Sequence, residues 1–263
     1  MKRSPGARLC ATAAIGALSL SLLTACSDEG AKDSADSKAS SSSSSAASSS
    51  SAPAAKALTT AELEKLLLAQ GELKGYKSES GDDTLPASKT AVKTDKPACD
   101  PLAWATAALA PGDTDANASN TVSEDKASGA TVQPEDFADA FDVDMTFVGL
   151  SSYEGDGAEK AMKAVSDGVT ACAGGYGLTA EGETTKVTKV VAEKGAAKGD
   201  EAVTFAADVD MDGAGTATFH TEVVRKGNTV ATFYTVNFAA MTKGGDMGAI
   251  PAAVVDAQVA KLK

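Results

Sequence analysis

The chain has 263 residues, with 24 lysines and arginines against 36 aspartates and glutamates, and a formal net charge of −12. Lys and Arg make the contacts to nucleic-acid phosphates and anionic lipid head groups, so this balance excludes nucleic-acid binding. Three basic residues and no acidic one fall within residues 1–25; without that segment 21 basic and 36 acidic residues remain, a net charge of −15.

A short apolar segment opens the chain. The three basic residues precede an uncharged, Ala- and Leu-rich run at 9–25, shorter than the roughly 20 residues of a membrane-spanning helix. This is the pattern of a secretory signal peptide over residues 1–25. The run ends in LTAC, which matches the lipobox of bacterial lipoproteins, so we predict cleavage before Cys26 and a diacylglyceryl anchor on its thiol. The alternative is ordinary secretion with Cys26 as a spare thiol.

A Ser- and Ala-rich segment follows. Residues 34–56 contain only Ser, Ala, Asp, Lys and one Pro, a composition that cannot form a core. A flexible chain spans roughly 5–6 Å times the square root of its length, so the segment 26–57 would hold a folded domain about 30 Å from the membrane. We predict a disordered tether here.

Structure is predicted to begin at residue 58 with a short amphipathic helix between Thr59 and Gly71. Thr59 and Glu62 have the spacing of a capping box, and Gly71 is a stop signal. A second helix is predicted with Asp100 as its N-cap, continuing over 101–112 with one proline in its first turn and another at its end.

A third helix is predicted over 157–172, where apolar residues recur every three or four positions. Between the second and third helices lies a polar stretch that ends at Pro134, and then an alternating segment, 141–150, that predicts a strand.

The last hundred residues alternate Val, Thr and Phe with polar residues in four predicted strands, 184–192, 201–210, 216–225 and 229–238. Lys226-Gly227-Asn228 joins the last two as a hairpin, because Gly and Asn tolerate positive φ. A final helix is predicted over 251–262. Antiparallel strands between helices indicate a single α+β domain over 58–263.

Four cysteines are present. Cys10 leaves with the signal peptide and Cys26 carries the lipid, so Cys99 and Cys172 remain. In an oxidising compartment two remaining thiols are expected to form a disulfide, here between the second and third helices. A redox-active or metal-binding pair is the alternative, but there is no Cys-x-x-Cys and no neighbouring His.

Catalytic patterns are sparse. His220 is the only histidine, no Gly-x-Ser-x-Gly motif accompanies it, and a zinc site needs three or four ligands. DVDMDG, residues 208–213, has the first half of an EF-hand loop, but position 12 is Phe219 instead of a bidentate Glu. A turn at the end of a strand explains the same residues, because Asp and Gly are common in turns. We therefore predict no enzyme, metal site or cofactor.

Aromatic and polar side chains in the predicted strands are candidates for a ligand cleft. Tyr153 follows a strand and precedes a Gly-containing turn, whereas Trp104 lies near Cys99 and is expected to pack on the disulfide. The predicted cleft residues are Tyr153, His220, Arg225 and Tyr234.

Several motifs resemble a known family. They are Cys99 with the Trp104 helix, VGLSSY (148–153), the helix into Cys172, GDEAVTF (199–205), VVRKGNTVATF (223–233) and QVAKL (258–262). Together they look like actinobacterial lipoproteins similar to the extracellular sensor domain of PknH-type receptor kinases. The resemblance implies a twisted antiparallel sheet flanked by helices and a cleft for a small ligand. The kinase relatives can have two disulfides, whereas this chain can form one, and it has no kinase domain.

The expected function is a non-catalytic ligand-binding or sensor-like lipoprotein on the outer face of the cytoplasmic membrane. Its partners would be the membrane, through Cys26, and an unknown small ligand. The alternative is an envelope lipoprotein that binds a protein partner and no small ligand. A closed apolar cavity would favour the first, and a contiguous exposed apolar patch the second.

Overall fold

A computed structural model describes residues 56–80, 85–125, 143–195, 199–213 and 215–262. All of these belong to one compact unit, Ser50–Lys263. The predicted signal peptide, the lipidation site Cys26 and nearly all of the predicted tether lie outside the described residues. Within the described part of the chain, no helix combines the length and apolar character needed to cross a membrane.

Helices and strands alternate irregularly along the chain. The helical elements are α1 (Thr60–Glu64), η1 (Lys89–Ala91), η2 (Pro97–Cys99), α2 (Asp100–Ala105), α4 (Gly157–Ala171), α5 (Phe238–Met241) and α6 (Ala252–Lys261). The strands are β1 (Tyr76–Ser80), β2 (Val92–Thr94), β3 (Asn117–Glu124), β4 (Asp144–Ser152), β5 (Tyr176–Ala180), β6 (Glu183–Glu193), β7 (Glu201–Asp210), β8 (Thr216–Lys226), β9 (Thr229–Asn237) and β10 (Gly245–Asp246).

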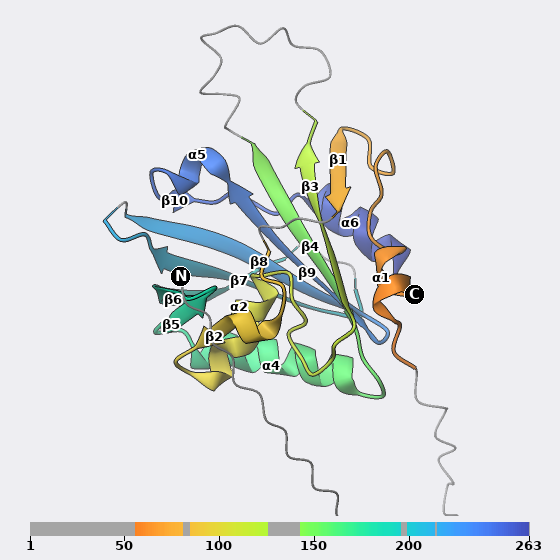
Figure 1. Cartoon of the computed structure of the whole chain (residues 1–263), viewed down its shortest axis with the longest axis horizontal. Helices are drawn as coiled ribbons and strands as arrows, with labels where there is room; N and C mark the ends of the chain where they lie inside the picture. Colours follow the sequence, from red (N-terminus) through yellow and green to blue (C-terminus); the bar gives the residue numbers. More distant parts are fainter. Residues whose placement is uncertain (1–55, 81–84, 126–142, 196–198, 214, 263) are drawn as a thin grey trace, which may run out of the picture. The chain divides into compact units, whose positions relative to one another are not determined.

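These strands form one sheet in the order β1-β3-β4-β9-β8-β7-β6-β5-β2. Every pair along this order is antiparallel. β9 pairs with β8 only as far as Tyr234↔Thr221, and beyond that point β10 pairs with Ala217 and Thr218 of β8 in parallel. The predicted α+β class is confirmed. The strands run in clearly different directions in Figure 1.

Helices cover both faces of the sheet. Alternate residues of a strand point to opposite faces, so each central strand contributes to two cores. On one face, α2 and α4 pack on side chains such as Phe205 and Val223. On the other, α1 and α6 pack on Val148, Leu150 and Phe233. In Figure 1, α2 and α4 lie together, and α1 and α6 lie beside β1.

The disulfide between Cys99 and Cys172 is confirmed, with 5.9 Å between the two Cα atoms. Both cysteines are fully buried, Cys99 as the N-cap of α2 and Cys172 as the C-cap of α4. Trp104, expected to pack on the disulfide, packs against the core cluster that contains both cysteines, and its Nε1 donates a hydrogen bond to Val92 O at 3.2 Å. The bond therefore joins two elements that cover the same face of the sheet.

The predicted helices differ from the observed ones mainly in their ends. The capping box of Thr59 and Glu62 is confirmed, but α1 ends at Glu64, well before Gly71. Asp100 was predicted to be an N-cap and is instead the first residue of α2, after Cys99 as N-cap. Its Oδ1 accepts hydrogen bonds from the N–H (3.1 Å) and hydroxyl (2.7 Å) of Thr94, so it fixes the end of β2.

The second helix was expected to continue to residue 112, and it ends at Ala105. Thr106 turns its hydroxyl back to Leu102 O at 3.0 Å, and Ala108 adopts φ 54°, a left-handed conformation that ends a helix. The prediction for the last two strands was close. Their hairpin turns at Gly227, with φ 58°, and Asn228, as predicted.

Candidate functional site

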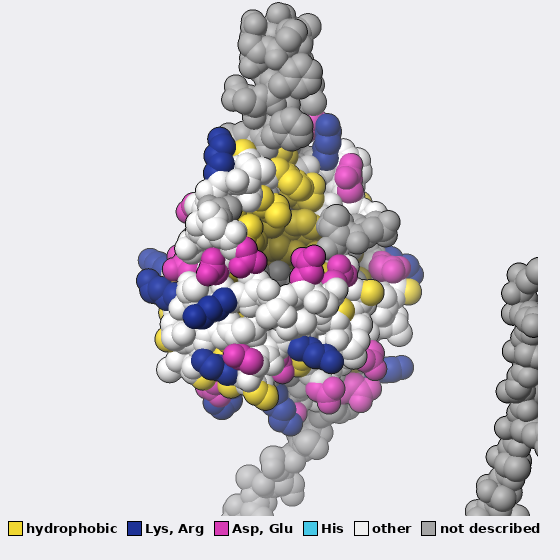
Figure 2. All heavy atoms as spheres, turned by 60° about the vertical axis from the view of Figure 1, so that its left-hand side comes forward, with side chains coloured by type: hydrophobic (Ala, Val, Ile, Leu, Met, Phe, Trp, Pro, Cys, Tyr) yellow, Lys and Arg dark blue, Asp and Glu magenta, His cyan; other side chains and the backbone are white. Residues whose placement is uncertain are grey.

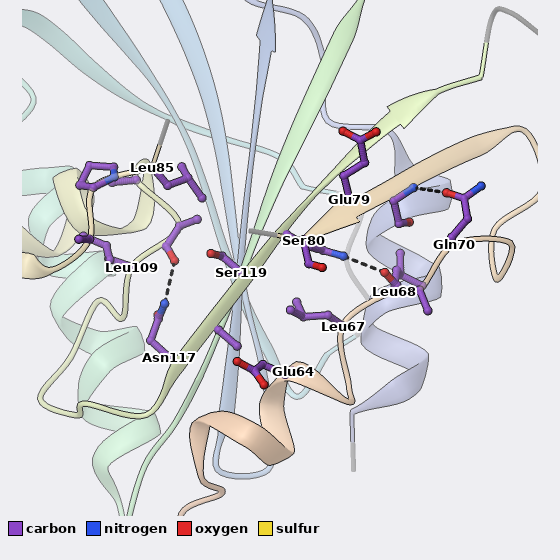
Figure 3. A pocket seen from close by; sticks show the side chains of 18 residues that line it. Glu64, Leu67, Leu68, Gln70, Glu79, Ser80, Leu85, Leu109, Asn117 and Ser119 are labelled. Atoms are coloured by element: carbon purple, nitrogen blue, oxygen red, sulfur yellow. Dashed lines mark hydrogen bonds between the residues drawn. The ribbon is translucent and has the colours of Figure 1, made fainter. Parts of the chain in front are cut away.

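A cleft of about 840 Å³ opens at the β1–β3 edge of the sheet. Its walls come from α1 and the turn after it, the end of β1, part of β3, and two segments near α2. Figure 3 shows Leu85 and Leu109 on one side and Leu67, Leu68 and Gln70 on the opposite side. The lining residues are 64, 67–70, 78–80, 85–87, 107–109 and 117–120.

Part of β3 forms an open strand edge in this cleft. β1 pairs with β3 only from Tyr76↔Glu124 to Ser80↔Asn120, whereas β4 pairs with β3 as far as Asn117. Among the described strands, none pairs with the outer side of 117–119. Backbone hydrogen-bonding groups at such an edge are available to another chain or a ligand.

Two asparagines of β3 hold the cleft walls. Asn120 Nδ2 donates a hydrogen bond to Leu68 O at 2.8 Å, and Asn117 Nδ2 donates to Ala108 O at 3.4 Å (Figure 3). The Oδ1 atoms of both side chains are buried and have no hydrogen-bond partner among the described residues. Asn120 as a whole is 2% exposed. We call this site the asparagine cleft.

The charge of the asparagine cleft is negative. Glu64 and Glu79 are exposed in its lining, and no Lys, Arg or His is among the described residues that line it. Ser78, Ser80 and Ser119 add hydroxyl groups. The asparagine cleft therefore favours groups that donate hydrogen bonds or carry positive charge over anions.

A second cavity of about 190 Å³ lies on the face of the sheet covered by α2. Its lining is almost entirely apolar and includes Val92, Val187, Phe219 and Tyr234. We call it the apolar cavity. Figure 2, which brings the left-hand side of Figure 1 forward, shows hydrophobic side chains gathered in a hollow with acidic side chains along its lower border.

Tyr176 contributes the most buried phenol of the apolar cavity. It is 4% exposed and lines the cavity. Burial raises the pKa of Tyr176, and the nearby charge of Asp100 raises it further. The group is therefore a neutral hydroxyl in the lining of the cavity.

The structure does not bring the four predicted cleft residues together. Tyr234 lines the apolar cavity and stacks on Phe147, with 4.8 Å between ring centroids. Tyr153 is 1% exposed in the core beside α4, and its hydroxyl oxygen accepts hydrogen bonds from Gly112 N–H (3.1 Å) and Ser151 Oγ (3.2 Å). Burial raises its pKa.

Arg225 and His220 lie elsewhere on β8 and line neither cavity. Arg225 stands at the β8–β9 hairpin, where its guanidinium is 3.4 Å from Glu201 and donates to Gly227 O at 3.2 Å. His220 lies between two carboxylates, with Nδ1 2.8 Å from Glu193 and Nε2 3.2 Å from Asp246.

The DVDMDG segment forms the end of β7 and the turn after it. Asp208 accepts a hydrogen bond from the Thr218 hydroxyl at 2.8 Å, and Asp210 accepts one from Asp212 N–H at 3.2 Å. Asp212 and Gly213 have φ 45° and 96°, as a tight turn requires. Among the described residues, no group of three or more His, Cys, Asp or Glu side chains is placed to hold a metal ion.

Sequence reasoning missed the asparagine cleft. The sequence predicts a polar connecting stretch where strand β3, NASNTVSE, lies. The available signal was a pair of asparagines in a segment with turn-forming composition, and that pattern does not separate a loop from an edge strand.

The chain is not matched by any protein-family model or by any curated protein. Among solved structures, it is similar to the extracellular domain of PknH from Mycobacterium tuberculosis, with a TM-score of 0.46 and 13% sequence identity. The match covers 78% of this chain and 97% of that one. At this identity and TM-score the likeness carries no functional information.

Proposed function

We propose that this chain is a non-catalytic, lipid-anchored binding protein outside the cytoplasmic membrane that holds a small ligand in the asparagine cleft. The observation that carries the proposal is a cleft of about 840 Å³ with two buried amide oxygens, of Asn117 and Asn120, that lack partners among the described residues. Ligand sites in proteins are clefts of roughly 300–1,000 Å³ with a few polar groups among apolar ones.

The two oxygens give the cleft a preference for particular ligands. A buried acceptor without a hydrogen bond costs about 1–3 kcal/mol. A ligand that displaces the atoms covering these oxygens and donates hydrogen bonds to Asn117 and Asn120 would remove that cost on binding. The same side chains already hold both walls through Ala108 and Leu68, so the acceptors are fixed before a ligand arrives.

The proposed location is supported by sequence and by covalent chemistry. LTAC at 23–26 has the lipobox pattern, and a Ser-rich segment separates it from the folded unit. A buried disulfide between Cys99 and Cys172 is typical of proteins in oxidising compartments. Acyl chains on Cys26 would supply about 0.8 kcal/mol for each buried methylene, enough for stable anchoring.

A non-catalytic role is supported by the setting of the only histidine. Both ring nitrogens of His220 face carboxylates, of Glu193 and Asp246, and its side chain lines neither cavity. It is thus already engaged in structural contacts.

Native mass spectrometry tests the ligand. The unit Ser50–Lys263 is compact by itself, so a chain that starts at residue 27 contains it whole and avoids the lipid. We expect this chain, exported to an oxidising compartment, to retain a small mass that is released on denaturation. Asn120→Ser should lose that mass.

Asn228→Ser is the matched control, because Asn228 also donates to backbone carbonyls but does so at the β8–β9 hairpin, outside the cleft. It should retain the mass. A ligand-free wild-type chain with an intact disulfide would refute the binding proposal and favour the alternative of an envelope protein-interaction role.

Metabolic labelling with palmitate tests the anchor. The full chain should incorporate the label and sediment with membranes, and Cys26→Ser should not be labelled. Cys10→Ser is the control, since it changes a thiol without touching the lipobox. Equal labelling of Cys26→Ser and the wild-type chain would refute the anchor.

A further inference from the structure

The asparagine cleft and the apolar cavity share lining residues. Pro86 and Ala107 line both of them. Along the chain, Thr106 faces the apolar cavity, whereas Ala108 and Leu109 face the asparagine cleft. A single turn of backbone after α2 therefore separates an acidic cleft of mixed polarity from a smaller apolar cavity.

We propose that the ligand is an amphiphile, with a hydrogen-bond-donating head group that carries no negative charge in the asparagine cleft and a short apolar tail in the apolar cavity. This inference rests on the proposed function and adds the chemical class of the ligand. The asparagine cleft mixes polar, acidic and apolar groups, whereas the second cavity is almost entirely apolar, and a molecule that fills both must cross from one to the other past Pro86 and Ala107.

The acceptors and charges of the asparagine cleft indicate the chemistry of the head group. The Oδ1 atoms of Asn117 and Asn120 have no donor among the described residues, and both need one. Glu64 and Glu79 are the only charged side chains among the described lining residues. A phosphate, sulfate or carboxylate head would meet two carboxylates and no cation there, whereas a polyol or an amine would meet acceptors.

The size and lining of the apolar cavity indicate the length and character of the tail. Its volume of about 190 Å³ equals about six water-sized groups of about 30 Å³ each, which suits about six carbons of a tail. Val92, Val187 and Phe219 supply the apolar contact surface. Tyr176 offers one neutral hydroxyl in this lining, enough for a polar atom in the tail but too little for a charged group.

Trp104 provides the signal for a binding experiment. It is the only tryptophan of the chain, and its indole N–H donates to the backbone of Val92, which lines the apolar cavity. The chain from residue 27 would be titrated below the critical micelle concentration with octyl glucoside, which joins a neutral donor-rich head to an eight-carbon tail. Octyl sulfate has the same tail with an anionic head, and glucose has a donor-rich head alone.

We expect octyl glucoside to change the Trp104 emission saturably, octyl sulfate to bind at least tenfold more weakly, and glucose to give no change. Replacing Glu64 and Glu79 by Gln should narrow the difference in affinity between octyl glucoside and octyl sulfate. Equal affinity for both probes would overturn the assignment of the head group.

The tail is tested by filling the apolar cavity. Ala180 lies half-buried in its lining, so Ala180→Phe should lower octyl glucoside affinity at least tenfold. Ala192→Phe is the matched control, because Ala192 is exposed on β6 and lines neither cavity. Circular dichroism would verify that both variants fold, and unchanged affinity in a folded Ala180→Phe would overturn the tail assignment.

The outcomes separate this inference from the proposed function. If native mass spectrometry finds a retained ligand that Asn120→Ser loses, while neither octyl probe binds, the amphiphile inference is overturned and the binding function stands. If no mass is retained and neither probe binds, both are overturned.

Discussion

Asn117 and Asn120 lie three residues apart on β3 and reach opposite faces of the sheet. Asn117 pairs with Ser151 and donates to Ala108 O on the face that α2 covers, whereas Asn120 pairs with Val148 and donates to Leu68 O on the other face. Because strand residues alternate between faces, this odd spacing lets one edge strand hold two walls that belong to different cores. The asparagine cleft exists where these walls meet the open edge.

Gln258 of α6 supports one of these walls. Its side chain is fully buried, its Oε1 accepts from Leu68 N–H at 3.0 Å, and its Nε2 donates to Leu66 O at 2.8 Å. Gln258→Leu leaves two backbone groups without partners, so we expect a loss of about 1–3 kcal/mol in the free energy of unfolding. Urea unfolding measures it.

The same substitution should weaken ligand retention, since Leu68 also accepts the hydrogen bond of Asn120. Ala260→Ser, at an exposed position of α6, serves as the control and should leave both stability and retention unchanged. Wild-type stability in Gln258→Leu would contradict the role assigned to this side chain.

Gly149 of β4 allows the other wall to approach the sheet. A Cβ at this position would collide with the carbonyl of Ala108 and lie 2.6 Å from Thr232 Oγ1. We expect Gly149→Ala to destabilise the fold by about 1–3 kcal/mol, the usual cost of overpacking. Thermal unfolding followed by circular dichroism would show it.

Gly174→Ala is the comparison for that experiment, because a Cβ at Gly174 meets nothing within 4 Å and its φ is not positive. Gly174→Ala should leave the thermal stability unchanged. Two glycine variants of equal stability would show that the chain segment around Ala108 is free to move away from β4.

The elements with strong periodicity could be predicted from the sequence. Strand β7, Glu201–Asp210, has the predicted bounds, and α4 and α6 differ from prediction by a residue or so at each end. Each buries an alternating or helical stripe of apolar side chains, which is the information that the sequence carries most plainly.

The elements that build the asparagine cleft could not be predicted in this way. β1 and β3 are polar edge strands, held by pairing and by side-chain hydrogen bonds such as that of Asn120. The end of α2 depends on a positive φ at Ala108, which no residue preference indicates. Tertiary contacts decide these features, so local sequence patterns do not reveal them.

The disulfide should contribute strongly to stability. Cys99 and Cys172 are 73 residues apart in sequence and fully buried. In the chain-entropy model, opening a loop of this length costs about 4 kcal/mol. We expect the double variant Cys99→Ala, Cys172→Ala to lower the free energy of unfolding by up to this amount, measured with urea under oxidising conditions.

Reduction provides the control for the disulfide. Dithiothreitol should destabilise the wild-type chain from residue 27 and leave the double alanine variant unchanged, because no other cysteine remains after Cys26 is removed. A wild-type midpoint that does not respond to reduction would contradict a stabilising role for the bond.

His220 connects three strands through charge. Its ring stands on β8 between Glu193 of β6 and Asp246 of β10, at 2.8 and 3.2 Å. Burial of the ring lowers its pKa, but the hydrogen bond and attraction of Glu193, together with Asp246, outweigh burial and hold the pKa above the ordinary value of 6.5. The protonated ring is therefore favoured in the folded state.

This raised pKa predicts a pH-dependent stability. Below pH 6.5 the ring is protonated in both the folded and the unfolded chain, so the two carboxylates contribute their full stabilisation. As the pH rises through the folded-state pKa, the proton leaves and that contribution is lost. The stability difference between wild type and His220→Gln, from urea unfolding, should therefore be largest near pH 6 and shrink toward pH 8. A difference that stays constant over this range would show that Glu193 and Asp246 do not stabilise a charged His220.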